Sequence, residues 1–220
     1  MLRVAVKLPA AAGRIGDYLA DVTALEAAGA DSIWLDAPTE TSIEASTEAW
    51  IHLGAIAAVT HRTRLGMTLG DSAAWPAAVD ILGRLTSGRV VIGTRPGRET
   101  KALVQQSKTQ RSDSPSPKIL IICDTPGEAE RSASLADGVI VPGGDQEVRA
   151  LRANRARDDD FELWVDVSVP ADKAGWAHMV TTLQAAGASG IIVPWGPRLI
   201  DLLRSAGEPD DRTDLLIATG

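Results

Sequence analysis

Short β-type runs alternate with helical patterns along most of the chain, and this alternation constrains the fold more than any other feature of the sequence. Some runs, such as residues 118–123, are apolar on both faces, which is typical of a parallel sheet covered by helices. Eight runs are predicted to be strands, at residues 2–8, 31–36, 63–69, 89–93, 118–123, 138–141, 161–169 and 190–193.

An internal repeat supports this interpretation. Residues 25–35 read Leu-Glu-Ala-Ala-Gly-Ala-Asp-Ser-Ile-Trp-Leu, and residues 183–193 read Leu-Gln-Ala-Ala-Gly-Ala-Ser-Gly-Ile-Ile-Val. Each copy ends a helix near glycine, which adopts the left-handed C-terminal conformation at little cost, and then enters a strand. Eight such strands favour a compact (β/α)8 TIM barrel that forms a single domain over residues 1–220, with a doubly wound open sheet as the alternative.

The connection at residues 94–117 departs from the pattern. It is basic at first and rich in Ser and Pro at its end. We expect a mobile loop here, with a short helix at residues 99–106, because long connections in compact domains are usually functional or disordered.

Composition narrows the functional classes. A net charge of −7 argues against a general nucleic-acid binder, which would need a basic face. The sequence has no apolar run of about 18 residues, so no membrane span is expected. The N-terminus enters a strand without a signal-peptide layout, and the single cysteine, Cys123, excludes an internal disulfide. These features predict a cytoplasmic protein.

Residues 60–97 carry a family resemblance. They read Thr-x-Arg-x-x-Leu-Gly, then a helix opened by Pro76, then Leu-Thr-Ser-Gly-Arg and a strand that ends in a Gly-rich turn. This combination resembles the luciferase-like flavin- and deazaflavin-dependent oxidoreductases. The resemblance covers residues 2–97 well and residues 118–141 loosely, and the central insertion after strand 4 is shorter here than in the family.

The resemblance implies a (β/α)8 barrel that binds FMN or 8-hydroxy-5-deazaflavin (coenzyme F-420). It further implies an oxidoreductase of the monooxygenase or reductase type that acts on a small organic substrate. Heavy use of Ala, Arg and Asp with few Lys suggests bacterial GC-rich coding, which favours the deazaflavin. A homodimer is expected by analogy alone.

Candidate site residues follow from the barrel, because function gathers at the C-terminal ends of the strands. Gly93, Thr94, Arg95, Gly97 and Arg98 combine small residues with guanidinium groups that match phosphate oxygens. The alternative is that these residues form a solvated basic turn without a ligand.

A second candidate phosphate site lies after the last strand. Gly196 and Arg198 fall near the usual barrel phosphate site. The alternative is structural: Pro197 suits the first position of a helix, so this sequence could simply mark a helix start.

Three further residues are candidates through the resemblance. Asp36 follows an apolar–Trp–apolar strand where relatives place an acidic residue and then His, but Pro38 replaces the His. Asp36 is therefore either a displaced catalytic and cofactor-binding equivalent or a cap of the next turn. Thr68 lies on the strand with which deazaflavin-binding relatives surround the cofactor ring, or it is simply part of the hydrophobic core. Thr125 lies near a cofactor turn of the family, or forms a capping box with Glu128.

Other chemistry-bearing residues give weaker signals. The histidines form no constellation, and no cluster has the spacing of a metal site. Cys123 ends an apolar strand and is expected to be an inert core thiol. Asp166 either pairs with Lys7 or Arg3 across the barrel or points into its mouth, because an unpaired buried carboxylate is costly.

Two functions therefore stay open. The first is the flavin- or deazaflavin-dependent oxidoreductase, whose partners are a small-molecule cofactor and substrate. The second is a non-catalytic barrel, derived from that family, that binds a flavin or a partner protein. The missing acidic–His pair and the short central insertion favour the second.

Overall fold

The structure is a computed structural model that describes residues 1–9, 14–35, 43–69, 75–97, 100, 104–105, 116–154 and 160–205; within these, only the backbone is described at 43–47 and 75–77. The strands are β1 Arg3–Leu8, β2 Ser32–Leu35, β3 Arg64–Leu69, β4 Val90–Thr94, β5 Lys118–Ile122, β6 Gly138–Pro142, β7 Glu162–Asp166 and β8 Gly190–Pro194. The helices are α1 Ile15–Ala27, α2 Ile43–Val59, α3 Trp75–Leu85, α5 Pro126–Ser132, α6 Asp145–Ala153, α7 Lys173–Ala186 and α8 Leu199–Ser205.

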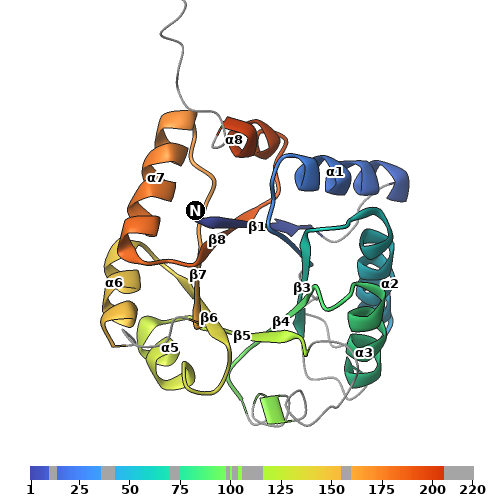
Figure 1. The fold of residues 1–220 in the computed structure, drawn as a ribbon, viewed down its shortest axis with the longest axis horizontal. Helices are drawn as coiled ribbons and strands as arrows, with labels where there is room; N and C mark the ends of the chain where they lie inside the picture. The colour runs from blue at the N-terminus through green and yellow to red at the C-terminus, as the bar shows by residue number, and fades with distance from the viewer. Residues whose placement is uncertain are drawn as a thin grey trace, which may run out of the picture.

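The eight strands form a closed parallel barrel in sequence order, and β1 pairs with β8 to complete the ring. The helices surround the strands, as Figure 1 shows in a view along the barrel. The predicted TIM barrel is thus confirmed, and the alternative of an open sheet is wrong.

All eight predicted strands exist, with small differences at their ends. The largest is at β7, which was expected to continue to residue 169 but ends at Asp166. Val167 still donates its N–H to the Ile192 carbonyl at 3.0 Å, and Pro170 has no N–H to continue the ladder. The helix predicted to open at Pro76 is present as α3, which begins one residue earlier, at Trp75. The loop expected at residues 94–117 and its short helix fall mostly outside the described residues.

The two sequence repeats form the same helix end. Gly29 and Gly187 both have φ of +96°, the left-handed conformation that a side chain disfavours. In each copy the following alanine donates its N–H to a leucine carbonyl five residues earlier, at 3.0 Å for Ala30 and at 3.0 Å for Ala188. These are Schellman-type helix ends, and they turn the chain directly into the next strand.

The barrel interior is filled by apolar side chains. Its buried cluster consists of Ala5, Trp34, Val91, Leu120, Ile140, Trp164 and Ile192. Two indoles take most of the space, and glycines make room for them. A Cβ on Gly66 would lie 2.2 Å from the Trp34 ring, and one on Gly190 would lie 2.3 Å from the Trp164 ring. The centre of the barrel is therefore a packed core rather than a pore, as in other TIM barrels.

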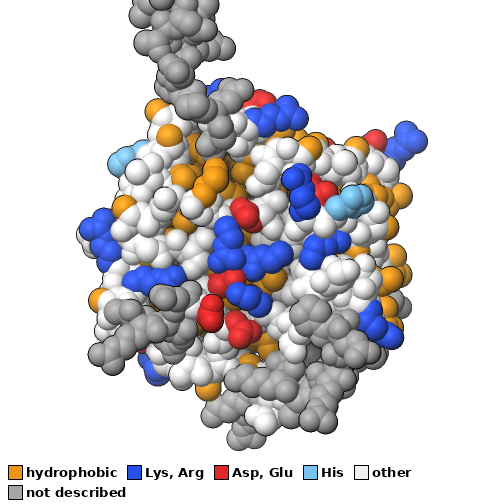
Figure 2. Space-filling model, viewed as in Figure 1, with side chains coloured by type: hydrophobic (Ala, Val, Ile, Leu, Met, Phe, Trp, Pro, Cys, Tyr) orange, Lys and Arg blue, Asp and Glu red, His pale blue; other side chains and the backbone are white. Residues whose placement is uncertain are grey.

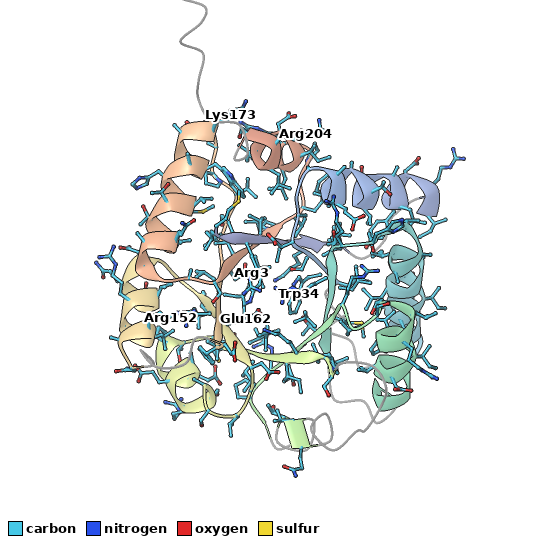
Figure 3. All side chains as sticks on the ribbon, in the orientation of Figure 1. Arg3, Trp34, Arg152, Glu162, Lys173 and Arg204 are labelled. Carbon is cyan, nitrogen blue, oxygen red and sulfur yellow. The ribbon has the colours of Figure 1, made fainter. Side chains whose placement is uncertain are left out.

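The layer of inward-facing side chains at the N-terminal end of the barrel is charged. Arg3, Arg64, Lys118 and Glu162 are the first residues of the odd-numbered strands, and they form one layer. Arg3, Arg64 and Lys118 all donate to Oε1 of Glu162, at 2.9, 3.2 and 2.6 Å. Figure 2 shows the charged side chains gathered at the centre of this face, and Figure 3 shows Arg3 and Glu162 close together there.

Glu162 stays ionised at this end of the barrel. Burial alone would raise its pKa. The hydrogen bonds from Lys118 and Arg3, the charge of Arg64 and a 2.8 Å hydrogen bond from Trp164 Nε1 outweigh that effect and lower the pKa to about 2. A buried carboxylate with this many donors is satisfied, so the layer is stable at neutral pH.

Candidate active site at the carboxyl end of the barrel

Lys7 and Asp166 meet at the carboxyl end of the barrel, which is where TIM-barrel enzymes place their chemistry. Each lies near the end of its strand, and the two strands flank β8. Lys7 Nζ donates to Asp166 Oδ2 at 3.1 Å, and the two side chains are 31% and 43% exposed. The sequence left two alternatives for Asp166, and the structure combines them: it pairs with Lys7 and it reaches solvent at the mouth.

Thr68 and Ile122 occupy the same level of the barrel as this pair, on the opposite side. Register places Thr68 beside Gly93, and both Thr68 and Ile122 are half-buried. Beneath them lies Trp34, which is 2% exposed and donates its Nε1 to Ser32 at 3.1 Å. The candidate site therefore has a polar pair on one side, a threonine and an isoleucine on the other, and an indole below.

Gly93 has a packing role in the structure. A Cβ there would lie 2.8 Å from the Trp34 ring and 3.0 Å from Ile122 Cδ1. The indole therefore fills the space that the missing side chain leaves. A cofactor contact at Gly93, as the sequence suggested, would have to come through its backbone, and it stays a prediction.

The turn after β4 is ordered by its own side chains. Arg95 Nη1 contacts both carboxylate oxygens of Asp124, at 2.9 and 2.8 Å, in an exposed ion pair. The hydroxyl of Thr100 donates to the Arg95 carbonyl at 2.7 Å and accepts from the Gly97 N–H at 3.1 Å. Thr94 lies in the register row of Leu69 and faces away from the barrel axis. Among the described residues of this predicted phosphate site, only Arg95 places a charged group at the mouth of the barrel.

Thr125 begins helix α5, as one of its two sequence readings predicted. Its hydroxyl accepts from the Glu128 N–H at 3.3 Å, and Pro126 follows as the first helical residue. The Glu128 carboxylate accepts from the N–H of Asp124 at 2.9 Å, one residue earlier than a capping box requires. The N-cap therefore forms, but Glu128 caps the N–H of Asp124 instead of that of Thr125.

Gly196 and Arg198 lie on the far side of the mouth from the β4 turn, since β4 and β8 are four strands apart in the ring. Nothing lies within 4 Å of a Cβ built on Gly196. Arg198 is exposed, and its Nη2 donates to the carbonyl of Ala171, so it joins the loop after β7 to the loop after β8. The two predicted phosphate sites are thus separate and lie on opposite sides of the mouth.

Asp36 and Arg98 lie outside the described residues, so their places in the site stay predictions. Leu35, which precedes Asp36, is buried and ends β2.

Cys123 and the histidines behave as the sequence predicted. Cys123 is 1% exposed, and burial together with the charge of Glu128 raises its pKa to about 11, which leaves an unreactive thiol. His61 and His178 are exposed, and His52 packs against the Tyr18 ring at 5.9 Å between centroids. Within the described part of the chain no three His, Cys, Asp or Glu side chains are grouped as a metal site would require. No described helix combines the length and apolar character needed to cross a membrane.

Sequence reasoning missed two structural features. The first is the charged layer at the N-terminal end, although its signal was present: four odd-numbered strands each begin with a charged residue. The second is the pairing of Trp34 with Gly66 and Gly93, in which a large side chain on one strand faces glycines on the next two strands. Reading the strands together as layers of four would have revealed both.

Neither a family model nor a curated protein sequence matches the chain. Solved structures do match its fold. An F420-dependent secondary alcohol dehydrogenase in complex with an F420-acetone adduct aligns with a TM-score of 0.69 at 11% identity, over 93% of this chain and 97% of that one. The coenzyme F420-dependent tetrahydromethanopterin reductase from Methanopyrus kandleri aligns with a TM-score of 0.66 at 11% identity, over 94% and 97%.

Barrels with other activities align nearly as well. Tryptophan synthase from M. tuberculosis, in its open form, gives a TM-score of 0.64 at 16% identity, over 92% of this chain and 90% of that one. At these identities the matches establish the TIM-barrel fold. Function has to be argued from the site, because one fold hosts many activities.

Proposed function

We propose that this protein is a deazaflavin- or flavin-dependent oxidoreductase of the luciferase-like type, which acts on a small organic substrate at the carboxyl end of its barrel. The observation that carries the proposal is the pair of Lys7 and Asp166 at that end, joined at 3.1 Å and half-exposed. The resemblance of residues 60–97 and the alignment with two F420-dependent barrels support the choice of cofactor.

The residues at the mouth fit such a cofactor. Its anionic tail needs donors and space, and Arg198 with the open backbone at Gly196 offers both. Thr68 and the β4 turn would contact the ring from the opposite side. FMN or the deazaflavin, when bound, supplies or accepts the hydride.

Lys7 would handle the proton. Its ammonium can donate a hydrogen bond to the oxygen of a carbonyl substrate and then transfer a proton to that oxygen as the carbon is reduced. The ion pair with Asp166 holds Lys7 Nζ at the mouth of the barrel, where it can act as that donor. Asp36 stays a second candidate for acid–base catalysis.

The test combines binding with turnover. We expect the purified chain to bind oxidised deazaflavin or FMN in a fluorescence titration, and to oxidise a secondary alcohol or reduce a ketone with the cofactor it binds. Lys7→Gln should lower kcat by about 10²–10⁴, the usual contribution of a positioned general acid, and leave the cofactor Kd unchanged. Lys173→Gln is the matched control, because Lys173 is an exposed lysine at the start of α7. Equal kcat values for wild type and Lys7→Gln would refute the role of Lys7.

A non-catalytic flavin-binding barrel is the second candidate. Pro38 favours it, because this proline stands where the family places the His of its acidic–His pair. Cofactor binding without turnover of any alcohol, ketone or oxygen would support this candidate over the first. Absence of binding to both cofactors would refute both.

The finer expectations follow the same proposal. They are a cytoplasmic location and a homodimer, the latter checked by light scattering on the purified chain.

A further inference from the structure

The charged layer at the N-terminal end of the barrel carries more positive than negative charge. Arg3, Arg64 and Lys118 all donate to one carboxylate, that of Glu162, so the four side chains together hold a net charge of +2. This layer lies at the opposite end of the barrel from the candidate active site. Nothing proposed above uses it.

The three cations have donors to spare. Among the described residues, Arg64 directs only Nη1 at Glu162, and Lys118 gives one of its three N–H groups to that carboxylate. Arg3 directs Nε to the Ser189 carbonyl and Nη1 to Glu162, which leaves its Nη2 without a partner among the described residues. Several charged donors at this end of the barrel therefore have no acceptor among the described residues.

These donors reach solvent, and the carboxylate does not. The side chains of Arg3, Arg64 and Lys118 are 31%, 22% and 46% exposed, whereas that of Glu162 is 5% exposed. Figure 2 shows basic side chains open to view at the centre of this face. The layer is thus a basic patch whose counter-charge lies beneath it.

The guanidinium groups are also held in place. Arg3 and Arg64 lie over the Trp164 ring, with Cζ 4.9 and 5.4 Å from its centroid. Trp164 is itself buried and hydrogen-bonded to Glu162. Donors fixed in this way lose little conformational freedom when they bind a ligand.

Two carboxylates lie at the same end of the barrel, directly before β2 and β6. Asp31 accepts the N–H of Val4 at 2.8 Å, and Asp137 accepts the N–H of Ile119 at 2.8 Å. Both are thus turned to backbone groups of the strand beside them. Their negative charges disfavour an extended polyanion such as nucleic acid, in keeping with the overall charge of −7.

We propose that this basic patch binds a small tetrahedral oxyanion, a phosphate group, through Arg3, Arg64 and Lys118. Guanidinium forks and an ammonium are the groups that match phosphate oxygens, and the surplus charge supplies the attraction. The ligand is either free phosphate or the phosphoryl group of a small metabolite. The site is independent of the proposed redox function.

The experiment measures phosphate binding to the full-length protein by isothermal titration calorimetry, at constant ionic strength set with chloride. We expect one site per chain. Lys118→Gln should weaken binding about tenfold, because it removes one charged donor. Glu162→Gln should tighten binding about tenfold, because it removes the competing negative charge and keeps the side-chain shape. Lys173→Gln, which changes the net charge equally at the other end of the barrel, should bind as wild type does.

The outcomes decide the proposal. An increase in affinity in Glu162→Gln together with a loss in Lys118→Gln supports it, and the Lys118 variant alone suffices if Glu162→Gln does not fold. Absence of saturable binding, or equal affinity in wild type and Lys118→Gln, overturns it. Loss of binding in Arg198→Gln with Lys118→Gln unchanged also overturns it, because the anion would then lie at the mouth. A parallel titration with a phosphomonoester identifies the source: competition indicates a phosphorylated metabolite, and binding of inorganic phosphate alone indicates the free ion.

Discussion

Gly66→Ala should destabilise the protein, because Trp34 already occupies the space that a methyl group needs. The added Cβ would lie 2.2 Å from Cδ2 of the indole, whereas ordinary contacts begin near 3.4 Å. The indole cannot move away freely, because its far edge packs against Gly93 on the next strand. The backbone at Gly66 has no unusual φ, so the cost is steric alone.

Overpacking of a core costs about 1–3 kcal/mol, and the confinement of Trp34 on two sides places Gly66→Ala near the upper value, about 3 kcal/mol. For a chain of this size, 1 kcal/mol shifts Tm by about 2–4 °C, so Tm should fall by roughly 6–12 °C. Urea unfolding followed by circular dichroism gives the free energy of unfolding directly.

Two comparisons separate the steric cause from a general effect of alanine. Gly83→Ala in α3 meets nothing within 4 Å and should stabilise the protein by about 0.5–1 kcal/mol, as removal of a helical glycine usually does. In a Trp34→Leu background, Gly66→Ala should cost much less, with a coupling of about 1–3 kcal/mol. An equal cost of Gly66→Ala with and without the indole would refute the argument.

Three further results are expected. The pKa of Glu162 is lowered from 4.5 to about 2, so its contribution to stability is full above pH 4.5 and is lost as pH falls towards 2. The loss in the free energy of unfolding is about 3 kcal/mol. Urea midpoints for Glu162→Gln should therefore vary less over this pH range than those of wild type. Gly187→Ala should cost about 1–2 kcal/mol, because φ is +96° and the new Cβ would lie 3.1 Å from Arg152; a neutral result in thermal unfolding would contradict the left-handed helix end. Thr125→Ala should cost about 1 kcal/mol through loss of the α5 cap, and Thr125→Ser, which retains the hydroxyl, should restore most of it in the same assay.

The barrel was predictable because its signals are local. Strands and helices follow from apolar periodicity, and the helix ends at Gly29 and Gly187 follow from a repeated sequence whose glycines have a defined backbone role. The closed ring followed from counting strands and from the shortness of their connections.

The site was harder to predict, because it depends on which residues share a level of the barrel. Sequence reasoning singled out Asp166 as a costly carboxylate and named Lys7 as one partner, and the structure joins them. It assigned Gly93 to a cofactor from its strand-end position, the neighbouring Arg95 and Arg98, and the family resemblance. Only the register across β2, β3 and β4 shows that the indole of Trp34 lies beside that glycine.

Closure of the ring between β1 and β8 also affects how the chain is made. One edge of the first strand, at Arg3–Leu8, has no partner until Gly190–Pro194 has been synthesised. At usual translation rates this wait lasts roughly 10–40 s, during which a growing sheet presents unpaired edges to other chains. Nascent chains that stop short of the last strand should therefore aggregate or recruit chaperones, and pairing of that strand with the first should remove the hazard.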